Sequence, residues 1–241
     1  MGEAQIPYLS FTGEALDLKQ ERTEAWKALS NNVREACETH GCFLLSYDGI
    51  PADLCQRMFV AAKPLFDLPE ETKNKYTNPD VIKSHITRSP ANPLLESFGI
   101  GDAQRLEEAQ AFTHLMWPNG NLSFCETLNL TSSKMMELCY ILLKMLFESL
   151  GMEMYYGSHV EADAKSTFRL FKYNAPPSNE EGAVGLEAHT DIDIITILCQ
   201  NEVQGLEIKS REGIWSQVTI PKGCFTVIVG EALKVHTFTR C

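Results

Sequence analysis

The order of apolar and polar residues predicts alternating strands and helices in the first part of the chain. Residues 6–11 (IPYLSF) form a short strand-like run. Apolar side chains then recur every three or four positions over residues 22–41, which predicts a helix that ends at Gly41. The apolar run CFLLSY at 42–47 lies between this glycine and the turn sequence DGIP, and it predicts a second strand.

Proline positions shape the next predictions. Residues 52–68 have a helical pattern in which Pro64 either kinks the helix or ends its first part. A further helix is predicted over 68–76, because Pro69 suits a first helical turn and two glutamates beside it favour the helix dipole. Between about 78 and 125, proline, glycine and asparagine become frequent and the periodicity fades. This predicts a long irregular segment that shapes a binding pocket.

A long amphipathic helix is predicted over residues 131–152, with Thr131 or Ser132 as its N-cap and Gly151 at its end. After it the pattern changes to short strands, which suggest an antiparallel barrel or sandwich. The predicted strands are 166–174, 194–200, 205–210, 214–220 and 224–230.

Composition limits the class of protein. With 241 residues, the chain can bury one large core, or a main core with a smaller companion. No apolar stretch is long enough to cross a bilayer and the N-terminus lacks a signal-peptide pattern, so we expect a cytoplasmic protein. The net charge of −11 opposes binding to nucleic acid. The eight cysteines lack C-x-x-C spacing and predict reduced core residues rather than a disulfide framework.

His189 and Asp191 stand two positions apart at the head of a β-branched run. On a strand, residues i and i+2 point the same way, so this spacing would bring the two side chains to one point. An imidazole nitrogen with a carboxylate oxygen suits Fe(II), and a second histidine would complete the facial triad of non-haem iron oxygenases. The alternative interpretation is a capping aspartate beside a surface histidine.

A longer pattern surrounds this pair. The stretch FRLFKYNAPPSNEEGAVGLEAHTDIDIITILCQNEVQGLEI, residues 168–208, resembles the plant-type 2-oxoglutarate and Fe(II)-dependent dioxygenases. Their pattern is R-x-x-x-Y, a proline-containing loop, G-L-x-x-H-T-D and T-I-L-x-Q-x-x-x-x-G-L-E. The upstream phrases IPYLSF, GCFLLSYDGIP and LPEETKNKY resemble the N-terminal part of the same family. The resemblance covers about residues 6–235, and it is greatest to the AOP-type and auxin-oxidase-like branch.

The resemblance implies an α+β fold with a double-stranded β-helix, or jelly-roll, core that is incomplete at the C-terminus and follows an N-terminal helical domain. Residues 1–125 would be the N-terminal non-haem dioxygenase domain with the irregular pocket segment. Residues 126–241 would hold the long scaffold helix and a partial Fe(II)/2-oxoglutarate dioxygenase jelly-roll domain.

The resemblance also implies site residues and cofactors. His189 and Asp191 become two iron ligands, and 2-oxoglutarate becomes the cosubstrate, with ascorbate as an additional cofactor. Tyr173 matches the tyrosine of R-x-x-x-Y, which helps to hold the distal carboxylate of 2-oxoglutarate. The alternative for Tyr173 is a packed strand aromatic with a satisfied hydroxyl.

The family pattern breaks near the end of the sequence. The family places its third iron ligand, a histidine, after G-D-x-L-x-x-W-S-N-G-R, and an R-x-S arginine soon after it. Here the corresponding residues 230–241 read GEALKVHTFTRC, which contain neither. His236 stands where the aromatic residue of the phrase is usual, which favours an exposed terminal histidine over a third ligand. We therefore expect weak binding of iron and of the cosubstrate.

The sequence thus predicts an Fe(II)- and 2-oxoglutarate-dependent oxidoreductase that hydroxylates, desaturates or otherwise oxidises a small plant metabolite. The alternatives are a truncated, non-catalytic member of the family and a binding module for a small molecule or a protein. We expect a small-molecule partner, no nucleic acid, no membrane and a monomer. The side chains of Phe112, Leu115 and Trp117 either line the substrate pocket or belong to the core.

Overall fold

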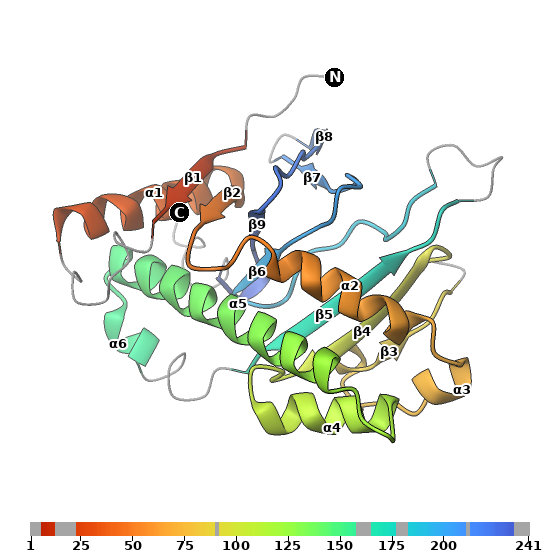
Figure 1. The fold of residues 1–241 in the computed structure, drawn as a ribbon. Helices are drawn as coiled ribbons and strands as arrows, with labels where there is room; N and C mark the ends of the chain where they lie inside the picture. Colours follow the sequence, from red (N-terminus) through yellow and green to blue (C-terminus); the bar gives the residue numbers. More distant parts are fainter. Residues whose placement is uncertain are drawn as a thin grey trace. The chain divides into compact units, whose positions relative to one another are not determined.

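The computed structural model describes residues 6–12, 23–89, 92–157, 165–176, 183–210 and 213–233 (Figure 1). The helices are α1 (Glu24–His40), α2 (Leu54–Phe66), α3 (Glu70–Lys73), the 3-10 helix η3 (Val81–Lys83), α4 (Leu106–Met116), α5 (Leu122–Ser149) and α6 (Glu153–Tyr155). The strands are β1 (Tyr8–Phe11), β2 (Cys42–Tyr47), β3 (His85–Ile86), β4 (Leu95–Gly101), β5 (Thr167–Tyr173), β6 (Ile195–Leu198), β7 (Glu207–Lys209), β8 (Trp215–Gln217) and β9 (Cys224–Val229).

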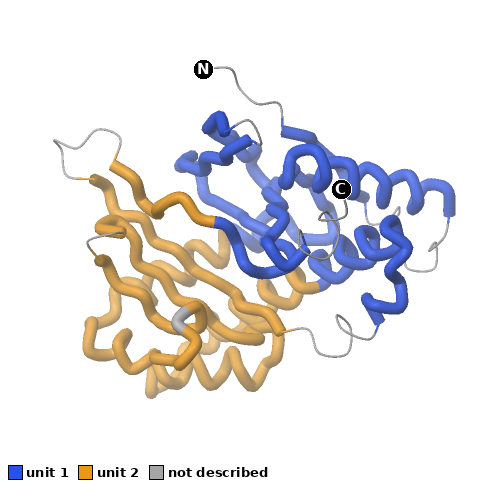
Figure 2. The backbone as a smooth tube through the Cα atoms, turned by 180° about the vertical axis from the view of Figure 1, so that it is seen from behind, with its two compact units in different colours: residues 1–55, 137–164, 190–241 blue, residues 56–136, 165–189 orange. Residues whose placement is uncertain are grey.

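The chain forms two compact units that interleave along the sequence (Figure 2). Unit 1 consists of residues 1–55, 137–164 and 190–241, and unit 2 of residues 56–136 and 165–189. These units are defined by packing in space, and the division of the sequence into 1–125 and 126–241 stays a prediction.

Unit 1 is built on a four-stranded sheet with the order β1-β2-β9-β6. The β1–β2 pair is parallel, whereas β9 is antiparallel to both of its neighbours. The central strand β9 has the sequence CFTVIV and is buried at five of its six positions. A continuous apolar run of this kind is typical of a strand that is covered on both faces. The short hairpin β7–β8 belongs to the same unit.

Helix α1 packs in unit 1 as its apolar period predicts. Thr23 caps its N-terminus by accepting from the amide of Trp26, and Gly41 ends it with a φ of 71°, in the left-handed region that glycine adopts without strain. The indole Nε1 of Trp26 donates to the Glu148 carboxylate of α5 over 2.6 Å. This bond satisfies the polar atom of a side chain that is otherwise fully buried.

Unit 2 packs helices on one face of the three-stranded sheet β3-β4-β5. Phe98, Ile100 and Leu170 point from this face into an apolar core that side chains of α2, α4 and α5 complete. On the opposite face of the sheet, Ser97 of β4 pairs with Phe171 of β5. Because side chains alternate along a strand, the residues two positions before and after Phe171 lie on this same face. This opposite face therefore holds Arg169 and Tyr173, the first and last residues of the R-x-x-x-Y phrase.

Most of the predicted elements are confirmed, and the strands from β5 onward lie where the apolar runs place them. The predicted start of the long helix was wrong, because α5 begins at Leu122. The hydroxyls of Thr131 and Ser132 donate to backbone carbonyl oxygens one turn earlier, over 2.7 and 2.8 Å, as they do inside a helix. Asn121 accepts from the amide of Phe124 over 3.1 Å and provides the cap.

The prediction of an irregular segment over 78–125 was also wrong. This segment contains η3, β3, β4 and α4, together with the first residues of α5. Phe112 is buried in the unit 2 core and Trp117 packs against it, whereas Leu115 is partly exposed. The two aromatic side chains are therefore core residues. No helix in the described ranges is both long and apolar enough to span a membrane.

Candidate functional site

His189 lies in an irregular, exposed segment that precedes β6. Its ring Nδ1 is 2.9 Å from the carbonyl oxygen of Glu187. A carbonyl oxygen can only accept, so Nδ1 is the donor and, in the neutral ring, Nε2 has the lone pair that a metal ion requires. The amide of Glu187 in turn donates to Asn92 Oδ1 over 3.2 Å. Asn92 and Glu187 thus orient the imidazole as outer partners of metal-binding histidines do.

Asp191 is half-buried, and its backbone is fixed against the end of β9 in unit 1. Its carbonyl oxygen accepts from the amide of Glu231 over 2.7 Å, and the amide of Gly230 donates to Ile194 over 3.0 Å. A Cβ atom at position 230 would lie 1.8 Å from the carbonyl oxygen of Asp193. Only glycine therefore allows this close approach of the two backbones.

His189 and Asp191 do not lie on a strand, as the spacing of the pair had predicted. Both residues precede β6, which begins at Ile195, so the alternation of side chains on a strand does not align them. The chemistry of the two donors still fits Fe(II), because an imidazole nitrogen and a carboxylate oxygen are its usual protein ligands. Within the described ranges, no group of three or more His, Cys, Asp or Glu side chains could hold a metal ion.

Tyr173 ends β5 and lies on the face opposite to the unit 2 core, together with Arg169 and Phe171. The rings of Phe171 and Tyr173 are nearly parallel, with centroids 6.3 Å apart. The Arg169 guanidinium stands 4.8 Å from the centroid of the Phe171 ring and donates to Ser97 Oγ over 3.2 Å. A Cβ atom on Gly185 would meet the Tyr173 ring at 2.7 Å, so the backbone there packs on the phenol.

The surroundings of Tyr173 favour its neutral form. Partial burial raises the pKa of the phenol, and the positive charge of Arg169 offsets only part of this effect. The hydroxyl of Tyr173 therefore keeps its proton at neutral pH and can donate a hydrogen bond. Both the tyrosine and the arginine of the R-x-x-x-Y phrase thus contribute polar groups to one strand face.

Two other histidines, His85 and His114, belong to unit 2 and have positions of their own there. His236 lies outside the described residues, as do the neighbouring motif positions Thr237 and Arg240. His85 belongs to a buried network in unit 2, where its Nε2 is 3.0 Å from Glu96 Oε1. His114 is an exposed residue in the last turn of α4.

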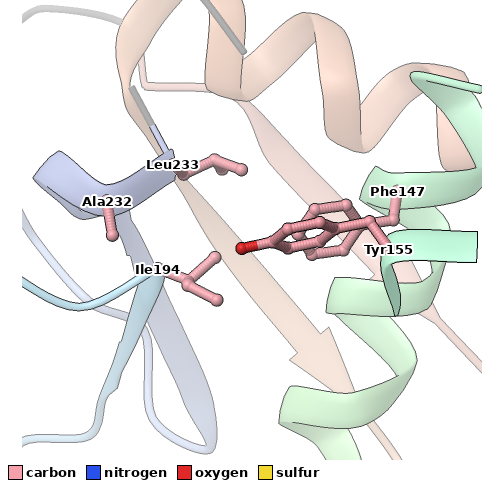
Figure 3. A pocket seen from close by; sticks show the side chains of 5 residues that line it. All are labelled: Phe147, Tyr155, Ile194, Ala232 and Leu233. Carbon is pink, nitrogen blue, oxygen red and sulfur yellow. The ribbon is translucent and has the colours of Figure 1, made fainter. Parts of the chain in front are cut away.

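A small cavity of about 30 Å³ in unit 1 is lined by Phe147, Tyr155, Ile194, Ala232 and Leu233, and the Tyr155 hydroxyl points into it (Figure 3). It is large enough for a water molecule but not for an organic substrate. A larger groove of about 490 Å³ runs between α2 and α5 in unit 2. No candidate site residue lines either space.

Comparison with known proteins identifies the family. Residues 13–119 match the N-terminal domain described as non-haem dioxygenase in morphine synthesis, and residues 164–240 match the 2OG-Fe(II) oxygenase superfamily. The probable 2-oxoglutarate-dependent dioxygenase AOP1 of Arabidopsis thaliana is 35% identical over 233 residues, which are 95% of this chain and 75% of that protein. The chain belongs to the plant 2-oxoglutarate-dependent dioxygenase family.

Solved structures of 2-oxoglutarate-dependent dioxygenases have the same fold. The Arabidopsis dioxygenase for auxin oxidation 1, in its complex with 2-oxoglutarate, superposes with a TM-score of 0.81 at 23% identity, over 95% of this chain and 81% of that chain. The dioxygenase for auxin oxidation of rice gives a TM-score of 0.76 at 27% identity, over 95% and 73% of the two chains. This likeness confirms the predicted jelly-roll class of the dioxygenase family at the level of the fold.

Sequence reasoning gave no role to three residues of this region: Asn92, Gly230 and Arg169. Asn92 binds the segment of His189 from a loop far away in the sequence, and Gly230 admits the backbone of residues 191–194. In the sequence, Arg169 is the arginine of the R-x-x-x-Y phrase, and no role was predicted for it. Gly230 and Arg169 both match letters of the family pattern, whereas the sequence carried no signal for Asn92.

Proposed function

We propose that the chain catalyses an Fe(II)- and 2-oxoglutarate-dependent oxidation of a small organic molecule, with His189 and Asp191 as iron ligands. The observation that carries this proposal is the hydrogen bond from His189 Nδ1 to Glu187, inside the G-L-x-x-H-T-D phrase of a family member. In the neutral ring this bond puts the lone pair on Nε2, which would be the nitrogen that binds the metal. The Asp191 carboxylate provides an oxygen ligand and a negative charge, which favours the divalent ion.

When bound, Fe(II) and 2-oxoglutarate supply the oxidising chemistry: oxygen is reduced, a C–H bond is oxidised, and 2-oxoglutarate becomes succinate and carbon dioxide. The protein holds the ligands in place. Asn92 and Glu187 fix the imidazole, while the bond between Asp191 and Glu231 fixes the backbone of the aspartate. Such outer partners commonly change metal affinity by about 10- to 100-fold.

For the cosubstrate, we propose that Tyr173 donates its hydroxyl hydrogen bond to the distal carboxylate of 2-oxoglutarate. The phenol keeps its proton at neutral pH, as a tyrosine ordinarily does, so its hydroxyl is able to donate. Arg169, on the same strand face, adds a positive charge for an anionic ligand. A charge-assisted bond from each group orients the cosubstrate.

For the substrate, we propose a small plant metabolite that undergoes hydroxylation, desaturation or a related oxidation. The names of the relatives support this class, because the solved Arabidopsis and rice proteins are dioxygenases for auxin oxidation. The two exposed rings of Phe171 and Tyr173 offer an apolar surface beside the cationic Arg169.

The test is an anaerobic titration of the 241-residue protein with Fe(II) and 2-oxoglutarate. Chelated 2-oxoglutarate gives a visible metal-to-ligand absorption band, which should appear and should be lost in His189→Ala and in Asp191→Ala. His114→Ala is the matched control, since this exposed histidine lies on α4, and its band should be unchanged.

Two further arms separate the alternatives. His236→Ala reports on the only histidine near the third-ligand position of the motif, and an unchanged band would exclude it as a ligand. Succinate release in air then distinguishes a turning-over enzyme from a chain that only binds. Stabilisation by 2-oxoglutarate without any dependence on metal would contradict the proposal and favour a binding module.

A further inference from the structure

Ser89 and His189 are the two ends of a continuous series of hydrogen bonds within unit 2. The Oγ of Ser89 accepts from the amide of Asn92 over 3.2 Å. Asn92 Oδ1 accepts from the amide of Glu187 over 3.2 Å, and the carbonyl oxygen of Glu187 is 2.9 Å from Nδ1 of His189. A displacement at the first residue of this series therefore changes the position of the imidazole at its end.

We propose that Ser89 is a positioning residue for the metal ligand His189 and that it acts through Asn92. The inference rests on the function proposed above. It extends the placing of this ligand to the segment between β3 and β4, about a hundred residues before the G-L-x-x-H-T-D phrase. The role of Ser89 is to hold the backbone of Asn92, so that the amide oxygen of that side chain stays opposite Glu187.

Ser89 and Asn92 hold each other through three contacts. The amide of Asn92 donates to both oxygens of Ser89, the carbonyl oxygen at 3.1 Å and Oγ at 3.2 Å, which is a three-centre bond. The amide of Ser89 donates to the carbonyl oxygen of Asn92 over 3.3 Å. Both backbone bonds are longer than the distance of about 2.9–3.0 Å that is most common. The hydroxyl therefore contributes substantially to the geometry of the pair.

Strands β4 and β5 anchor the segment that contains Asn92. The amide of Leu95, the first residue of β4, donates to the carbonyl oxygen of Asn92 over 3.3 Å. The carbonyl oxygen of Leu94 accepts from the backbone amide of Asn174 over 2.9 Å and from its side-chain Nδ2 over 3.0 Å. Asn174 directly follows Tyr173, the last residue of β5. The proposed metal ligand and the proposed cosubstrate residue thus share one hydrogen-bonded support.

Ser210 provides a matched comparison elsewhere in the chain. It directly follows β7 in unit 1, and its Oγ accepts from the amide of Ile214 over 3.3 Å. Its own amide donates to the carbonyl oxygen of Ile214 over 2.8 Å. Ser210 supports its hairpin as Ser89 supports the segment before β4. Removing either hydroxyl costs a bond of the same kind, but only the loss at Ser89 should reach His189.

The experiment compares the whole chain with Ser89→Ala, Ser89→Thr and Ser210→Ala in the anaerobic titration with Fe(II) and 2-oxoglutarate. Because a neutral hydrogen bond contributes modestly, Ser89→Ala should bind Fe(II) about 3- to 10-fold more weakly. Ser89→Thr keeps a hydroxyl and should restore the affinity, and Ser210→Ala should match the wild type. Equal Fe(II) affinity in Ser89→Ala and Ser210→Ala would overturn the inference.

A double-mutant cycle tests the route through Asn92. If Ser89 acts through Asn92, then Ser89→Ala should weaken Fe(II) binding no further in a chain that already contains Asn92→Ala. Additive losses from the two substitutions would contradict this route, because they would mean that the two side chains affect the metal separately.

A measurement without metal separates this inference from the proposed function. Nitrogen NMR of the metal-free protein at alkaline pH, where the imidazole is neutral, reports which ring nitrogen of His189 is protonated. His189→Gln identifies the signals. We expect mainly the Nδ1–H form in the wild type and in Ser210→Ala, and less of it in Ser89→Ala. An unchanged ratio in Ser89→Ala would overturn the inference, whereas the expected ratios in a protein that gives no absorption band would count against the proposed function alone.

Discussion

The amide of Glu231 donates a 2.7 Å hydrogen bond to the carbonyl oxygen of Asp191. This bond ties the segment before β6 to the residues after β9, beyond the last pair of their ladder, Ile195 and Val229. The segment that carries the proposed carboxylate ligand is thus anchored by a backbone hydrogen bond to the residues that follow β9. Supporting hydrogen bonds of this kind place a binding group more accurately.

The first prediction concerns Gly230, whose missing side chain permits this contact. Gly230→Ala would place a Cβ atom 1.8 Å from the carbonyl oxygen of Asp193 and push the segment of Asp191 away. We expect a loss of about 1–3 kcal/mol in unfolding free energy and an Fe(II) affinity at least about tenfold lower. Gly205→Ala is the control, because no atom lies within 4 Å of its Cβ position. Equal Fe(II) affinity in the two variants would contradict the role of this contact.

The second prediction concerns Asn92 as a positioning residue for His189. Asn92→Ala removes the acceptor for the amide of Glu187, whose carbonyl oxygen orients the imidazole. We expect Fe(II) to bind about 10-fold more weakly, while the thermal midpoint changes little because the bond is exposed. Asn92→Asp keeps an acceptor oxygen and should restore the affinity. A purely structural role would instead lower the thermal midpoint in Asn92→Ala and leave the affinity unchanged.

The strands after residue 166 and the helix α1 could be predicted from sequence, because short apolar runs and a regular helical period are local signals. Strand β4 and helix α4 were missed, since the prolines around them resemble a loop composition. In the structure, Pro79, Pro93 and Pro118 lie between the elements and not inside them. A proline-rich composition thus marks where helices and strands end, and it does not mean that helices and strands are absent.

The part of the candidate site whose residues lie in one continuous stretch of sequence could be predicted. His189, Asp191 and Tyr173 belong to a continuous motif, and the family they indicate is confirmed. The contacts of Asn92 with Glu187 and of Arg169 with Ser97 join residues far apart in the chain. Such pairs follow from strand register and loop packing, which a single sequence does not specify.

The third prediction concerns the hydroxyl of Tyr173. Tyr173→Phe keeps the ring on Phe171 and removes only the proposed donor to the distal carboxylate of 2-oxoglutarate. A bond to a charged group contributes about 1.5–3 kcal/mol, so the Kd for 2-oxoglutarate should rise at least about tenfold. The anaerobic absorption band measures this constant. Tyr76→Phe is the control, because the hydroxyl of Tyr76 donates to the backbone of Gly99 instead, and its Kd should match the wild type.

The fourth prediction concerns a buried ion pair in unit 2, where Lys73 Nζ donates to Glu96 Oε1 over 2.6 Å and His85 lies 3.0 Å from the same oxygen. Burial opposes the charge of Glu96, but the bonds and charges of Lys73 and His85 prevail and lower its pKa below 4.5. The stability that this carboxylate contributes is therefore complete above pH 4.5 and is lost as the pH falls through the folded-state pKa.

Glu96→Gln should cost about 3–5 kcal/mol at neutral pH by leaving Lys73 uncompensated, and its unfolding free energy should depend less on pH in this acid range. Urea titrations across pH measure both effects. The exposed Glu71→Gln should stay within about 0.5 kcal/mol of wild type, and a Glu96→Gln protein as stable as that control would refute the prediction.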